Sequence, residues 1–84
     1  MLNKNAKLNR LHEISDAVNY ELEMTEKEAT TLYDYAETLI YLVENGKNYT
    51  AVVAELKNEI ATQLTTDNAK KALAELLNTM HYYK

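Results

Sequence analysis

Residues 29–43 have the sequence ATTLYDYAETLIYLV, and this stretch decides the fold. Its apolar side chains recur at alternating intervals of three and four residues, which on an α-helix places them in one continuous stripe. The stripe consists of Ala29, Leu32, Tyr33, Ala36, Leu39, Ile40 and Val43. At about 100° per residue, these side chains fall within about 60° either side of Ala36. The pattern predicts a helix with all seven residues, Tyr33 included, facing a core.

Two further apolar residues widen this arc. Tyr35 and Leu42 lie about 100–120° to one side of the stripe centre. The whole arc is wider than one neighbouring helix needs. We therefore expect this helix to contact two or more others, or one neighbour and a second copy of the chain.

Local signals mark where the helices begin and end. Thr25 and Glu28 fit a capping box, which predicts a helix start at Glu26, and Gly46 can take the left-handed conformation that closes the helix after Asn45. Asn48 and then Thr65 or Thr66 can serve as N-terminal caps of two later helices. The spacing of Leu8, Leu11, Ile14, Val18 and Leu22 predicts one earlier helix. The predicted helices span residues 4–23, 26–45, 49–64 and 67–81.

Composition favours one small helical domain over residues 1–84. The 84 residues include no proline, no cysteine and a single glycine, Gly46. Connections of about two to four residues predict an all-α bundle of three to four helices in up-and-down order, with an array of orthogonal hairpins as the alternative. The lack of cysteine, of a signal-peptide core and of a long apolar run indicates a cytoplasmic protein with no membrane segment.

Residues suited to catalysis or metal binding are sparse. The only histidines are His12 and His81, and the chain has neither a cysteine nor a glycine-rich phosphate loop. We therefore predict a protein that is not an enzyme and that needs no cofactor or metal.

Acidic residues concentrate in the middle of the chain. The net charge is −4, yet residues 13–46 hold nine acidic residues against one lysine. Asp34 and Tyr41 point away from the apolar stripe of residues 26–45, and Glu37 and Glu44 lie alongside them. Tyr20 lies near the end of the preceding helix. Tyrosines supply large, rigid contacts at binding hot spots. An acidic face bearing tyrosines predicts a non-catalytic module that binds a basic protein surface by imitating the phosphates of a nucleic acid. The edge formed by Tyr35 and Leu42 is the alternative surface for binding another protein. An ordinary solvated helix surface is the alternative interpretation.

Two other functions remain open. A structural homodimer would bury Tyr35 and Leu42 against a second copy. A DNA-binding helix-turn-helix would use the last two helices, with Asn68, Lys70 and Lys71 reaching the nucleic acid. The turn lacks the usual glycine, Lys71 stands where an apolar anchor belongs, and the chain offers little basic surface, so nucleic acid is the less favoured partner.

The first helix begins with the cations Lys4, Lys7 and Arg10. The helix macrodipole disfavours positive charge at this end. Either these side chains contact acidic groups elsewhere in the molecule, or the helix frays there.

In length and in its economy of helices, the chain resembles small phage- or plasmid-encoded accessory proteins, among them inhibitors of host or defence enzymes. It also resembles the helical bundles of bacteriocin immunity proteins. No motif accompanies either resemblance, so neither assigns a role to a residue.

Overall fold

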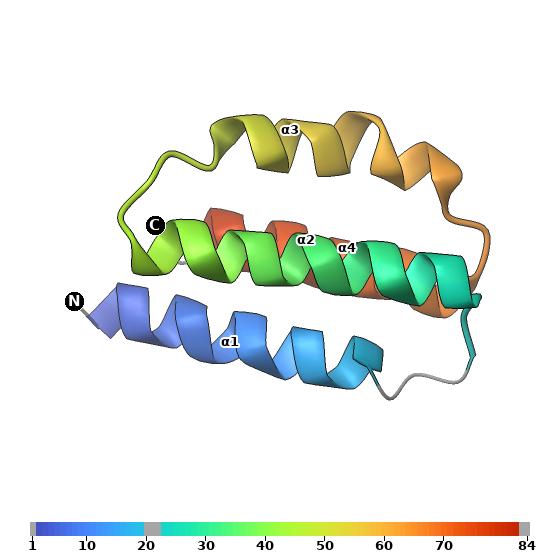
Figure 1. Ribbon diagram of the computed structural model, residues 1–84, viewed down its shortest axis with the longest axis horizontal. Helices are drawn as coiled ribbons and strands as arrows, with labels where there is room; N and C mark the ends of the chain where they lie inside the picture. Colours follow the sequence, from blue (N-terminus) through green and yellow to red (C-terminus); the bar gives the residue numbers. More distant parts are fainter. Residues whose placement is uncertain (1, 20–22, 83–84) are drawn as a thin grey trace.

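The computed structural model describes residues 2–19 and 23–82 and shows an all-α bundle, as the sequence predicts. Its elements are α1 (Leu2–Asn19), α2 (Glu26–Glu44), α3 (Thr50–Asn58), the short 3₁₀ helix η1 (Ile60–Gln63) and α4 (Asp67–Tyr82). Consecutive α-helices run in opposite directions, and α1 and α3 lie on either side of the pair formed by α2 and α4 (Figure 1). The overall dimensions are 35 × 24 × 18 Å.

Local hydrogen bonds fix both ends of α2. The Thr25 N–H donates to Glu28 Oε1 at 3.0 Å, and the Glu28 N–H donates to Thr25 Oγ1 at 3.1 Å, which completes the capping box. Gly46 has a φ of +64°, and the Lys47 N–H donates to the Leu42 carbonyl at 2.9 Å. This six-residue bond defines a Schellman ending, so α2 stops within one residue of the predicted boundary.

The predicted helix over residues 49–64 is in fact two elements. The α-helical part stops at Asn58 and continues as η1 after Glu59. Both the N–H and the hydroxyl of Thr62 donate to the Glu59 carbonyl, at 3.2 and 2.7 Å. A threonine hydroxyl that competes for a backbone carbonyl favours the tighter 3₁₀ turn over the α-helix.

The first helix also differs from its predicted span. It already begins at Leu2 and is described as Leu2–Asn19. Residues 20–22 of the predicted span lie outside the described residues, and Glu23 is not helical. Of the predicted caps, Thr66 Oγ1 accepts the Ala69 N–H at 3.2 Å at the start of α4. Asn48 Oδ1 accepts the Thr50 N–H at 2.8 Å, although the residue in the N-cap position of α3 is Tyr49.

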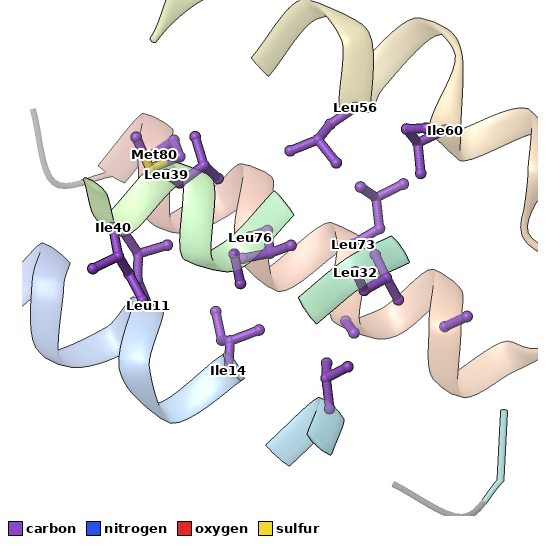
Figure 2. Close-up of a cluster of buried hydrophobic side chains, with 14 of the residues drawn as sticks. Leu11, Ile14, Leu32, Leu39, Ile40, Leu56, Ile60, Leu73, Leu76 and Met80 are labelled. Carbon is purple, nitrogen blue, oxygen red and sulfur yellow. The ribbon is translucent and has the colours of Figure 1, made fainter. Parts of the chain in front are cut away.

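The core has two halves that meet between α2 and α4. Figure 2 shows Leu11 and Ile14 of α1 approaching from one side and Leu56 of α3 with Ile60 from the other. The buried apolar residues of α2 and α4 between them include Leu32, Leu39, Ile40, Leu73, Leu76 and Met80. Within α3, only Leu56 is buried, so this helix is the least embedded of the four.

Tyr33 is not a core residue, contrary to the prediction, because 38% of its surface is exposed. It lies at the edge of the apolar stripe, about 60° from the centre. At such an edge a tyrosine keeps its hydroxyl in water while part of its ring packs.

Candidate functional site

One exposed face of α2 gathers aromatic and acidic side chains. We call it the tyrosine-acid face and define it as Tyr33, Asp34, Glu37, Tyr41 and Glu44. Tyr33, Glu37 and Tyr41 follow one another at four-residue intervals, so they share one side of the helix. Tyr41 is 55% exposed, and these two tyrosines are the exposed large apolar residues of the described chain. No lysine or arginine occurs between residues 29 and 46. The face is therefore aromatic, acidic and about 16 Å long at 1.5 Å per residue.

Most of this face is unused inside the molecule. Across the described residues, the side chains of Asp34, Tyr41 and Glu44 make no hydrogen bond or ion pair. Glu37 differs, because its Oε2 accepts the hydroxyl of the buried Ser15 at 2.8 Å and so links α2 to α1. Glu37 therefore has a structural contact as well as an exposed position.

The structure separates the other predicted residues from this face. Tyr35 and Leu42 are half-buried, and Tyr35 packs against the core. They lie on the opposite flank of α2 from Tyr33, so the homodimer hypothesis would use a different surface. Tyr20 lies outside the described residues.

The strongest electrostatic feature is Glu28, which the sequence identifies only as a capping residue. Its side chain is 95% buried, since only 5% of its surface is exposed. Oε2 accepts the N–H groups of Thr65 at 2.6 Å and Thr66 at 3.2 Å, while Oε1 accepts the Thr66 hydroxyl at 2.9 Å. With the Thr25 N–H, these donors lower the pKa of Glu28 from 4.5 to about 2. Glu28 is a structural clasp between α2 and the turn before α4.

The contact of Glu28 with Thr65 and Thr66 can be predicted from the sequence only when the order and direction of the helices are also known. In an up-and-down bundle, the start of the second helix and the start of the fourth lie at the same end. A carboxylate there meets the free N–H groups that precede the fourth helix.

The cations of α1 have partners, and α1 is helical throughout this region. Arg10 pairs with Glu75 of α4 at 3.4 Å and with Glu13 at 3.0 Å. Lys4 Nζ donates to the Glu44 carbonyl at 3.4 Å, at the C-terminus of α2. The N-terminus of α1 lies beside the C-terminus of the antiparallel helix α2. The negative partial charge of the Glu44 carbonyl there offsets the unfavourable effect of the α1 macrodipole on Lys4.

Other site chemistries find little support in residues 2–19 and 23–82. No group of three or more His, Asp or Glu side chains there could hold a metal ion. No helix in that part of the chain is both long and apolar enough to cross a membrane. The helices α3 and α4 run antiparallel (Figure 1), whereas the two helices of a helix-turn-helix cross at about 90–120°.

Comparison of the chain with protein-family models, with curated proteins and with solved structures finds no match. Its class therefore rests on the fold alone, which is a small all-α bundle of four helices.

Proposed function

We propose that this chain is a non-catalytic protein-interaction module that binds a basic protein surface through the tyrosine-acid face of α2. One observation carries the proposal. Within the part of the chain whose side chains are described, the two exposed large apolar residues, Tyr33 and Tyr41, lie on the same side of one helix with Glu37 between them. Aromatic residues on an exposed helix face are typical anchors of a helix-mediated contact.

The charges indicate the chemistry of the partner. The carboxylates of Asp34 and Glu44 have no intramolecular partner in the described chain, so they remain available to lysine or arginine side chains. Complementary charge speeds association and fixes orientation, while the tyrosine rings supply buried area. A basic groove that accepts nucleic acid is one surface with this complementarity.

Glu44 is unfavourable for the stability of α2. It lies in the last turn, where the macrodipole disfavours negative charge, and its carboxylate forms no hydrogen bond or ion pair within the described residues, although Lys4 Nζ donates to its backbone carbonyl. Because Glu44 does not stabilise its own helix, we infer that it serves the contact with a partner. Together with the small size and the absence of cysteine, this supports a cytoplasmic accessory or inhibitor protein of the phage or plasmid type.

Affinity capture from the native host with a tagged chain tests this proposal. The face variant is Asp34→Lys/Glu44→Lys, which spares Glu37 and its bond to Ser15. The matched control is Glu55→Lys/Glu59→Lys, which makes the same change in net charge at exposed positions outside α2. We expect the face variant to recover at least tenfold less of a basic partner and the control to recover the wild-type amount. Equal recovery by both variants would contradict the proposal.

A further inference from the structure

A second surface feature lies away from the tyrosine-acid face. A groove of about 720 Å³ runs between α3 and α4. Its main lining residues are Tyr49, Val53 and Lys57 on one side and Leu77, Met80 and His81 on the other. This volume falls within the range of about 300–1,000 Å³ that small-molecule sites occupy.

The groove exists because α3 is only partly embedded. Leu56 is its single buried residue, which leaves Val53 and the facing Leu77 half-buried. Apolar walls are therefore open to a ligand over the full length of α3. Among the described residues of the lining, Lys57 and His81 are basic and none is an aspartate or glutamate, so their charge favours an anion.

A buried cation, Lys7, contacts Tyr49, one of the residues that line this groove. Lys7 of α1 is 95% buried, since only 5% of its surface is exposed. Its Nζ donates to Tyr49 Oη at 2.8 Å and lies 4.8 Å from the centroid of the Tyr49 ring. Among residues 2–19 and 23–82, no carboxylate forms an ion pair with Lys7. A buried ammonium is costly when its contacts are neutral, so a nearby anion would stabilise it.

Tyr49 connects this cation to the groove. Its oxygen accepts from Lys7, which leaves the hydroxyl hydrogen as the remaining donor. No acceptor for that hydrogen occurs among the described residues, and the Tyr49 side chain lines the groove. A hydroxyl polarised by an ammonium donates most strongly to a negatively charged acceptor. His81, which also lines the groove, offers a second donor near the same end.

We propose that the groove between α3 and α4 binds a small amphipathic carboxylate. The apolar chain of the ligand lies against Val53, Leu77 and Met80. Its carboxylate accepts the Tyr49 hydroxyl, and Lys7 supplies the positive field behind that bond. The site is independent of the tyrosine-acid face, because none of its residues belongs to α2.

Titration with decanoate, followed by the amide spectrum of the labelled protein, tests this assignment. The comparison ligand is 1-decanol, which has the same chain but no charge. We expect saturable shifts in α3 and α4 with decanoate and at least tenfold weaker binding of decanol. Shifts elsewhere, no shifts at millimolar decanoate, or equal affinities for the two ligands would overturn the proposal. The proposal would also be overturned if an apolar peptide bound the groove through its terminal carboxylate while decanoate did not bind.

Variants test separately the contact with the ligand carboxylate at Tyr49 and the contact with its apolar chain at Val53. Tyr49→Phe keeps the ring but removes the hydroxyl, and it should weaken decanoate at least fivefold while leaving decanol unchanged. Thr30→Val removes an exposed hydroxyl on α2, outside the groove, and should change the binding of neither ligand. Val53→Trp fills the groove with an indole ring, so it should abolish binding of both ligands. Undiminished decanoate binding by Val53→Trp or by Tyr49→Phe would contradict the assignment.

Discussion

The carboxylate of Glu28, in the first turn of α2, accepts the backbone N–H of Thr65 at 2.6 Å, although 37 residues separate the two in sequence. The same side chain completes the capping box with Thr25 and accepts from Thr66. One carboxylate therefore both begins α2 and holds the turn before α4. This position fixes one end of the helix that carries the tyrosine-acid face.

Replacing Glu28→Gln should destabilise the fold by about 2–3 kcal/mol. The amide group of glutamine is a donor and would face the N–H groups that the carboxylate now accepts, and hydrogen bonds to a charged group contribute about 1.5–3 kcal/mol. For a domain of this size, the melting temperature should fall by about 10–20 °C. Glu26→Gln is the control, because Glu26 is exposed in the same turn and should leave the melting temperature nearly unchanged. Equal melting temperatures for both variants would contradict the role of Glu28.

Stability should decline at acidic pH because of the same residue. The pKa of Glu28 is about 2 in the folded protein and 4.5 ordinarily, so the unfolded chain takes up the proton first. The stabilisation is complete above about pH 4.5 and disappears as the pH falls towards 2. This lowering of the pKa corresponds to at most about 3 kcal/mol of stabilisation at neutral pH.

Urea unfolding at pH 6, 4, 3 and 2 measures this dependence. The free energy of unfolding of the wild type should decrease through this window more steeply than that of Glu28→Gln. Parallel decreases in the two proteins would assign the acid sensitivity to other carboxylates.

The helix α3 should open before the rest of the bundle. Because Leu56 is its only buried residue, its amides should exchange with solvent faster than those of the central α2 and α4. Leu56→Ala should lower the free energy of unfolding by about 2–4 kcal/mol and accelerate exchange in α3 most. Uniform exchange across all four helices would show that α3 is held as firmly as its neighbours.

The homodimer hypothesis makes a different prediction from the proposed function. If Tyr35 and Leu42 formed a dimer interface, Leu42→Glu would convert a dimer to a monomer. We expect instead a wild-type monomer at micromolar concentration, because both residues are already half-buried within one chain. Light scattering on a sizing column measures the molar mass. A wild-type dimer that Leu42→Glu dissociates would favour the structural role.

Features with local causes were predictable from the sequence. The capping box of Thr25 and Glu28 and the positive φ of Gly46 depend on neighbouring residues only, so the start and end of α2 follow directly. The exposure of Asp34 and Tyr41 follows from helix periodicity.

Features that depend on tertiary placement were not predictable in the same way. The second role of Glu28 requires the turn at Thr65 to lie at the same end of the bundle. The bond from Ser15 to Glu37 depends on the register of α1 against α2, and the exposure of Tyr33 depends on how far its neighbours reach. Periodicity gives the direction of a side chain but not what covers it.

Site-specific photo-crosslinking in the native host tests the proposed interaction most directly. The probe is Tyr41→p-benzoylphenylalanine, which keeps an aromatic side chain on the tyrosine-acid face, and the control is Glu55→p-benzoylphenylalanine on α3. We predict a light-dependent adduct with a basic protein from position 41 and none from position 55. No adduct from position 41, or the same adducts from both positions, would contradict binding through this face.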